Sequence, residues 1–177
     1  MRPVRAWRHA WPARLAGAVA LLLPLQDALA VERSALEAAI VFNVLQFVEW
    51  PNEAAQPDGA PLTLCFKADS PLLPPARQLE GRLVRRMTLH VLKFDVAQHQ
   101  CQAVYVDSPQ AEQDARGALR EPALVIGASD YRPAVRPSIQ LAYGDGRLAF
   151  DIDQRKAQQS GLTISSRLLK LARSVVE

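Results

Sequence analysis

The chain has 177 residues, 49% of them apolar, and carries 21 lysines and arginines against 18 aspartates and glutamates. Residues 1–30 hold four of the arginines and one aspartate, which leaves the remainder with 17 side chains of each sign and a net charge near zero. This balance argues against a nucleic-acid-binding surface, and the apolar content argues against disorder. The length beyond residue 30 suits one domain with a buried core.

The N-terminal segment has the three parts of a cleavable signal peptide, predicted over residues 1–30. A basic region with four arginines and no acid precedes the apolar run Leu15–Leu25. Ala28-Leu29-Ala30 then offers the small-x-small pattern that signal peptidase accepts. Because the apolar run is shorter than the roughly 20 residues needed to cross a bilayer, we predict export to the periplasm without membrane insertion after cleavage. An uncleaved N-terminal anchor is the alternative.

Helical and extended patterns alternate in the first half of the mature chain, residues 31–177. Apolar residues at i, i+3 and i+4 spacing predict the first helix, which Pro51 ends. The expected elements, in chain order, are a helix over 32–50, a strand over 62–66, a helix from the N-cap Ser70 to about Leu79, and strands over 83–94 and 101–106. Strands joined by helices predict a sheet that is parallel and buried in this half.

The second half predicts one more helix and strand, a hairpin and a helical C-terminus. The expected elements are a helix from the N-cap Ser108 to about Leu119, a strand over 123–126, hairpin strands over 139–141 and 148–152, helical spacing over 153–157, and a final amphipathic helix containing Leu168, Leu169, Leu171, Ala172 and Val175. The predicted fold class is therefore α/β: a single-domain sandwich with a mixed, mostly parallel sheet flanked by helices, a C-terminal β-hairpin and a terminal helix.

No motif in the sequence demands catalysis, so we expect neither an enzyme nor a cofactor. The sequence contains no phosphate-binding loop, dinucleotide-binding fingerprint or nucleophile elbow. Ser160, Ser165 and Ser166 lie near a glycine, where caps and turns explain serines better than nucleophilic chemistry does. Asp151 and Asp153 share one side of a predicted strand. Acid–base work is one interpretation of that pair, but the solvent face of a half-buried hairpin, open to a partner protein, is favoured.

The two cysteines of the chain, Cys65 and Cys101, lie beyond the predicted cleavage site. In an oxidising compartment a disulfide is the default fate of such a pair, worth roughly 3–4 kcal/mol in the chain-entropy model. Two separately buried thiols are one alternative. A metal site that adds His90 and His99 to the two thiolates is another, although the spacing lacks C-x-x-C and H-x-x-x-H patterns. We predict no metal.

Five stretches follow one another through the mature domain: LQFVEWP at 45–51, LTLCF at 62–66, CQAVYV at 101–106, GRLAFDID at 146–153 and GLTISSRLLKLAR at 161–173. Jointly they resemble the YfiR family of periplasmic regulators. The resemblance implies a non-catalytic protein that binds the periplasmic sensor region of an inner-membrane diguanylate cyclase and represses it. Release would raise cyclic-di-GMP and promote biofilm formation. The family is also linked to redox control through disulfides and to homodimers.

The resemblance places partner binding at Asp151, Ala157 and the last helix, with Leu168 and Leu169. Adjacent leucines cannot both face the same core, so either one is exposed for docking or the helix packs on two sides. The family's second cysteine pair would fall within residues 127–140, which contain no cysteine here, so redox control through that pair cannot operate. The family commonly has Asn where this chain has Asp153.

Two other classes of function stay open. A periplasmic small-molecule binding module would place its pocket at the carboxyl ends of the parallel strands. A metal-handling protein would use the two histidines and the two cysteines.

Overall fold

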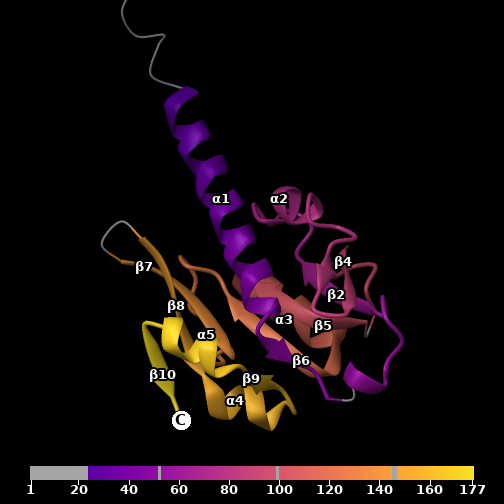
Figure 1. Cartoon of the computed structure of the whole chain (residues 1–177). Coiled ribbons are helices and arrows are strands. Elements are labelled where there is room, and N and C mark those ends of the chain that lie inside the picture. Colours follow the sequence, from indigo (N-terminus) through magenta and orange to yellow (C-terminus); the bar gives the residue numbers. More distant parts are fainter. Residues whose placement is uncertain (1–23, 52, 99, 145–146) are drawn as a thin grey trace, which may run out of the picture.

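A curled, eight-stranded sheet forms the centre of the computed structural model, which describes residues 24–177 apart from 52, 99 and 145–146 (Figure 1). Its strands are β2 (Pro61–Phe66), β3 (Leu83–Val84), β4 (Met87–Lys93), β5 (Cys101–Val106), β6 (Leu119–Gly127), β7 (Ile139–Gly144), β8 (Arg147–Asp153) and β10 (Ser174–Val176). They lie in the order β10-β8-β7-β6-β5-β2-β4-β3. The run from β4 through β2, β5 and β6 to β7 is parallel, whereas β3–β4 and β7–β8 are antiparallel. The predicted mixed, mostly parallel α/β fold is confirmed.

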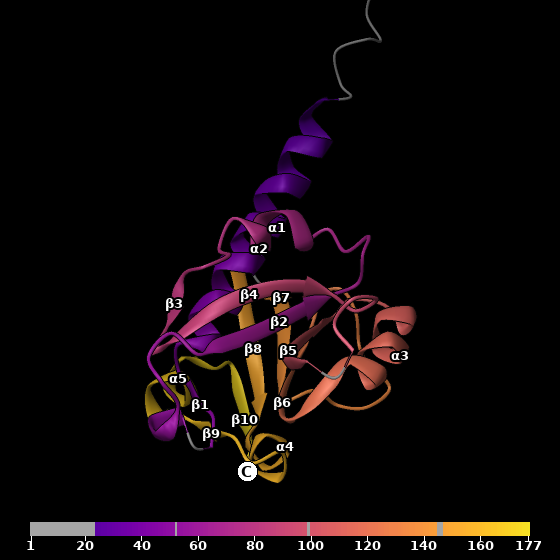
Figure 2. The same ribbon diagram turned by 90° about the vertical axis from the view of Figure 1, so that its right-hand side faces the viewer.

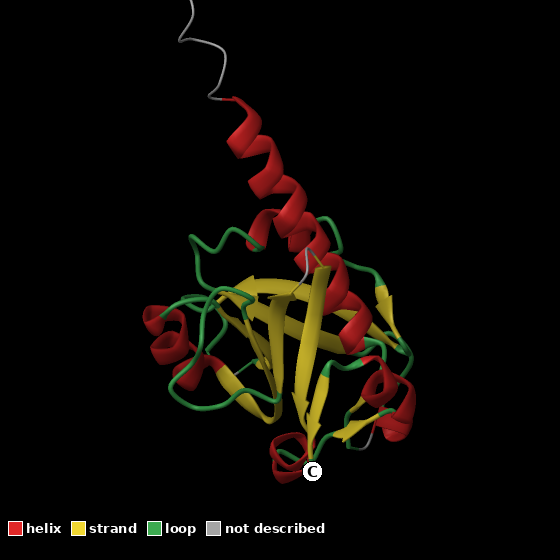
Figure 3. Ribbon diagram, turned by 90° about the vertical axis from the view of Figure 1, so that its left-hand side faces the viewer, coloured by secondary structure: helices red, strands yellow, loops and turns green. Residues whose placement is uncertain are grey.

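Helices cover both faces of this sheet. They are α1 (Pro24–Leu45), α2 (Leu73–Arg77), α3 (Pro109–Ala118), α4 (Gln154–Gln159) and α5 (Ser166–Leu171), with a short 3-10 turn η1 (Glu53–Ala55). Two further strands, β1 (Val48–Glu49) and β9 (Thr163–Ile164), pair with each other outside the main sheet. Figure 2 shows that the sheet is curled, because β4 and β2 lie at a large angle to β7 and β8. Helices α1 and α2 lie on one side of the sheet and α3 on the other. The secondary structure is coloured in Figure 3.

Alternation along the parallel strands divides the interior into two cores. In β5, Ala103 and Tyr105 belong to the larger core under α1, while Val104 and Val106 belong to a smaller core under α3. Nearly every residue of β2 and β5 is buried, because both faces of the sheet are covered by helices.

The first helix packs by the expected spacing but ends earlier than the sequence predicted. Ala38, Val41, Val44 and Leu45 are buried at helical intervals. The helix stops at Leu45 rather than at residue 50, because the chain then pairs as β1 with β9, an interaction that local sequence does not reveal. Figure 1 shows the start of α1 projecting beyond the sheet. Among the described residues, no helix has the length and apolar character to span a membrane.

Three other boundaries differ from prediction. The single strand expected over 83–94 is a hairpin of β3 and β4, because Arg85 adopts a left-handed turn conformation with φ of 56°. Helix α2 begins at Leu73, so Ser70 is not its N-cap. The last helix ends at Leu171, and Val175 instead lies in β10, which adds to the sheet beside β8.

Most of the predicted signal peptide, residues 1–23, lies outside the described residues. The boundary at residues 30 and 31 therefore stays a prediction.

Candidate functional site

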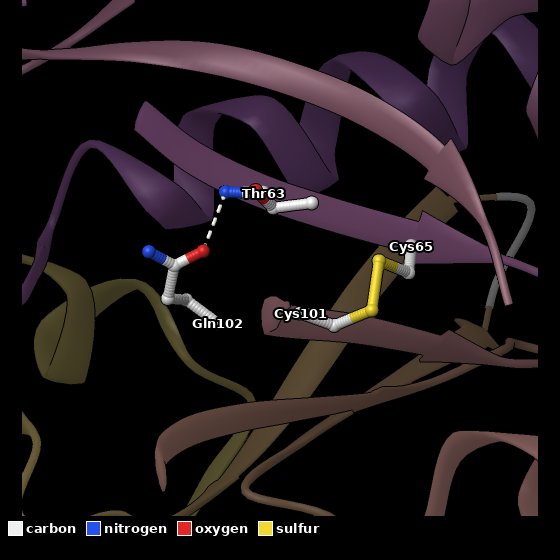
Figure 4. The surroundings of a disulfide bond; sticks show 4 residues. All are labelled: Thr63, Cys65, Cys101 and Gln102. Carbon is white, nitrogen blue, oxygen red and sulfur yellow. Dashed lines mark hydrogen bonds between the residues drawn. A yellow bond between two sulfur atoms is a disulfide. The ribbon is translucent and has the colours of Figure 1, made fainter. Parts of the chain in front are cut away.

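A disulfide joins Cys65 in the middle of the sheet to Cys101 at the start of β5 (Figure 4). The Cα atoms are 5.8 Å apart, and both residues are fully buried in the core under α3. The predicted bridge is therefore present, and the alternative of two separate thiols is wrong. Because both sulfurs are in the disulfide, neither is a thiolate that could bind a metal.

Two histidines remain from the metal hypothesis. His90 lies beside Glu80, with its Nδ1 3.0 Å from the carboxylate, and His99 is outside the described residues. No cluster of three or more potential metal ligands occurs in the part of the chain that the structure describes.

Next to the disulfide, the side chain of Gln102 continues the pairing of β2 and β5. The backbone register joins Leu64 to Ala103 and Cys65 to Val104. Beyond it, the Gln102 amide oxygen accepts from the backbone N–H of Thr63 at 2.8 Å, and its amide nitrogen donates to the carbonyl of Pro61 at 3.1 Å (Figure 4). The disulfide and the Gln102 side chain thus both link β2 to β5, and we call this pairing of the two strands the seam. No local sequence signal announces the role of Gln102.

Asp151, the first partner-binding candidate, lies on the outer face of β8 and is held by Arg173. The guanidinium donates to both carboxylate oxygens, at 2.9 and 2.5 Å. This hydrogen bonding lowers the pKa of Asp151, so the carboxylate stays ionised at neutral pH. Phe150 and Ile152 are buried on the opposite side of the strand.

Asp153 is committed to a structural task. Its carboxylate caps α4 by accepting from the backbone N–H of Lys156 at 3.0 Å. Ser165 caps α5 in the same way, accepting from Arg167. These contacts favour the structural interpretation of Asp153 and Ser165 over the catalytic one.

The other candidates differ in their exposure. Ala157 and Leu168 are buried in the larger core and so are not available for direct contact with a partner, while Leu169 is half-buried against the same core. Both adjacent leucines therefore contact the core, which fits the alternative of a helix that packs on two sides. Leu171, which the sequence reasoning did not single out for docking, is 67% exposed.

The loop between β6 and β7 is fastened to α3 by a single carboxylate. We call residues 130–137 the strap. Glu112 accepts hydrogen bonds from the backbone N–H groups of Ala134 and Val135, at 3.0 and 3.3 Å, and from the Tyr131 hydroxyl at 3.1 Å. The backbone bond from Ala134 contributes most to lowering the pKa of Glu112. No local sequence pattern indicates these hydrogen bonds to Glu112.

A polar cavity of about 340 Å³ lies between the strap and the outer face of the hairpin. Asp151 and Gln140 line it from the strands, and Arg132 and Arg136 line it from the strap. Asp151 therefore faces a recess with two arginines in addition to its own partner, Arg173.

A buried polar network joins α1 to the sheet. Glu37 accepts from the hydroxyls of Tyr105, at 2.7 Å, and Ser129, at 2.5 Å. Arg33 donates to Ser129 and stacks over the ring of Tyr143, 4.3 Å from its centroid. Burial is the main cause that raises the pKa of Tyr105, followed by the Glu37 charge, so the tyrosine remains a hydrogen-bond donor.

Comparison with known proteins identifies the family of this chain. The model of the YfiR/HmsC-like family matches residues 34–173, which includes the seam, the strap and the C-terminal segment. No curated protein sequence matches. Seven chains of solved structures match. One is a conserved domain protein from Vibrio cholerae O1 biovar eltor str. N16961, with 12% sequence identity and a TM-score of 0.45. That match covers 80% of this chain and 60% of the Vibrio chain. By the family match, this protein belongs to the YfiR/HmsC-like family, whose members are periplasmic regulators rather than enzymes.

Proposed function

We propose that this protein binds the periplasmic sensor region of an inner-membrane diguanylate cyclase and represses cyclic-di-GMP synthesis. The family match over residues 34–173 is the observation that carries the proposal. Export by the predicted signal peptide would bring the domain to the compartment where such a sensor region lies.

The docking surface that we propose is the C-terminal patch, defined as Leu171 with the ion pair of Asp151 and Arg173. Leu171 is the most exposed large hydrophobic side chain of the described residues, whereas Leu169 of the same short helix is half-buried against the core. An exposed leucine beside charged groups suits the anchor and rim of a protein interface. Ala157 and Leu168 are buried, so they would contribute through the packing of α4 and α5.

The ion pair of Asp151 and Arg173 ties β8 to the start of β10. Their strands pair in parallel, with Ser174 opposite Asp151, and the backbone N–H of Arg173 donates to the carbonyl of Phe150 at 2.8 Å. The pair therefore fixes the end of α5, which carries Leu171. We infer that Asp151 serves binding through this placement as well as by direct contact.

Redox tuning would act through the disulfide. The paired strands β2 and β5 lie in the middle of the eight-stranded sheet. Reduction would loosen this pairing and weaken the sheet, whose β8 and β10 end carries the C-terminal patch. Because the disulfide is fully buried, a reductant would reach it only when the domain opens.

The test is co-purification of the mature protein with the cyclase's periplasmic domain, together with cellular cyclic-di-GMP. Leu171→Asp should abolish binding and raise cyclic-di-GMP to the level of a deletion strain. Leu83→Asp is the matched control, because Leu83 is 62% exposed on β3, at the opposite end of the sheet. Equal binding by wild type and Leu171→Asp would overturn the docking surface, and absence of binding by the wild type would overturn the function.

A further inference from the structure

The core under α3 is incompletely filled because the buried face of that helix consists of alanines. Ala111, Ala115 and Ala118 are its buried residues. Interiors are normally close-packed, and an alanine methyl group cannot reach the sheet as a leucine would. A cavity of about 140 Å³ remains, with Val104, Val106 and Val125 from β5 and β6 along one side and Ala115 on the other.

The strap closes another side of this cavity. Pro133 and Val135 contribute apolar surface, and the three hydrogen bonds to Glu112 fix their position over α3. The site is therefore preformed, with its wall anchored to the helix that it faces. The cavity lies between α3 and the face of the sheet, whereas the sequence suggested a pocket at the carboxyl ends of the strands.

The polar residues that line this cavity are mostly cationic: Arg116, Arg136 and Lys156, against Glu112 alone. Glu112 is already engaged by the strap and lies 3.5 Å from Arg116. Arg136 approaches Asp153 only to 4.0 Å. Within the described residues, the ammonium group of Lys156 has no carboxylate oxygen within 4.0 Å. The lining therefore carries more positive than negative charge, and Lys156 is its one cation without a carboxylate partner among the described residues.

We propose that this cavity binds a small monocarboxylate with a compact apolar body, such as a phenyl ring or a branched alkyl group. The volume is close to the roughly 150 Å³ of an apolar cavity that accepts benzene. The body would enter among the valines, and the carboxylate would meet Lys156 and Arg136. An apolar pocket with a few converging polar groups is the usual form of a small-molecule site.

Fluorine NMR on the full mature protein tests this, with 4-fluorophenylacetate as the probe. We expect saturable binding with a Kd on the order of 0.1–1 mM, the range for a ligand of this size. The neutral 4-fluorophenylacetamide and the cationic 4-fluorobenzylamine should bind at least tenfold more weakly. Equal binding of all three probes would indicate an apolar recess without preference for carboxylates and would overturn the proposal, as would no binding of the acid.

Two variants locate the site. Ala115→Leu fills the cavity and should remove binding while keeping or raising the urea midpoint. Lys156→Gln should weaken binding about two- to fivefold, the range for an exposed charge pair, whereas Lys170→Gln on α5 should leave it unchanged. Equal affinities of the two lysine variants would contradict the proposal even if Ala115→Leu failed to fold. No partner protein is needed, so failure here would leave the proposed function standing.

Discussion

Replacing both cysteines by alanine should remove a large part of the stability of the domain. The bridge closes a loop with a sequence separation of 36. In the chain-entropy model, a loop of this size contributes about 3.8 kcal/mol at 25 °C. For a domain of this size that corresponds to a fall in Tm of about 8–15 °C. Alanine is preferable to serine because a hydroxyl in this apolar core would add the cost of an unpaired polar group.

The assay is urea unfolding of the wild type and of Cys65→Ala/Cys101→Ala, each with and without reductant. The oxidised wild type should exceed the variant by about 3–4 kcal/mol, and reductant should remove most of that difference without affecting the variant. A thiol count on denatured, non-reduced wild type should find none. Two free thiols, or a difference below about 1 kcal/mol, would refute the reasoning, since loss of a native bridge typically costs more.

Two further changes test the buried network and the strap. Tyr105→Phe should cost about 1–3 kcal/mol in urea unfolding, because it takes a hydrogen-bond donor from the buried Glu37; the exposed Tyr143→Phe is the control, and equal losses would contradict this. Because the pKa of Glu112 is lowered in the folded state, its stabilisation is complete above the ordinary glutamate pKa of about 4.3 and is lost as pH falls through the lower folded value. The amide proton shift of Ala134 should follow that titration in the wild type and stay flat in Glu112→Gln, and a flat wild-type profile would count against the fastening.

The sequence predicted the elements that depend on local pattern. Strands β2 and β5 and the end of β6 appear as apolar runs and β4 as an alternation, and Ser108 caps α3 as expected, accepting from the backbone N–H of Ala111 at 3.2 Å. The hairpin of β7 and β8 and its inward-facing Phe150 also follow from alternation. The cysteine pair was predictable because the expected compartment, rather than the spacing, implies a bridge.

The misjudged elements depend on contacts between distant segments. Val48 and Glu49 leave α1 because β9, more than one hundred residues later, pairs with them. The spacing of Val175 fits a helix, but its backbone pairs with Ile152 along the edge of β8, so Val175 lies in β10. The fastening by Glu112 uses backbone N–H groups of the strap, which carry no side-chain signature. The apolar cavity also depends on how α3 packs over the sheet, which no local pattern in the sequence indicates.

We propose that the C-terminal patch of this family member holds a diguanylate cyclase inactive. The most direct measurement is cyclic-di-GMP in a deletion strain complemented with wild type, Leu171→Asp or Leu83→Asp, with equal periplasmic amounts verified. Wild type and Leu83→Asp should restore low cyclic-di-GMP, and Leu171→Asp should leave it at the level of the deletion strain. Cyclic-di-GMP that stays the same with and without the wild-type protein would contradict the claim.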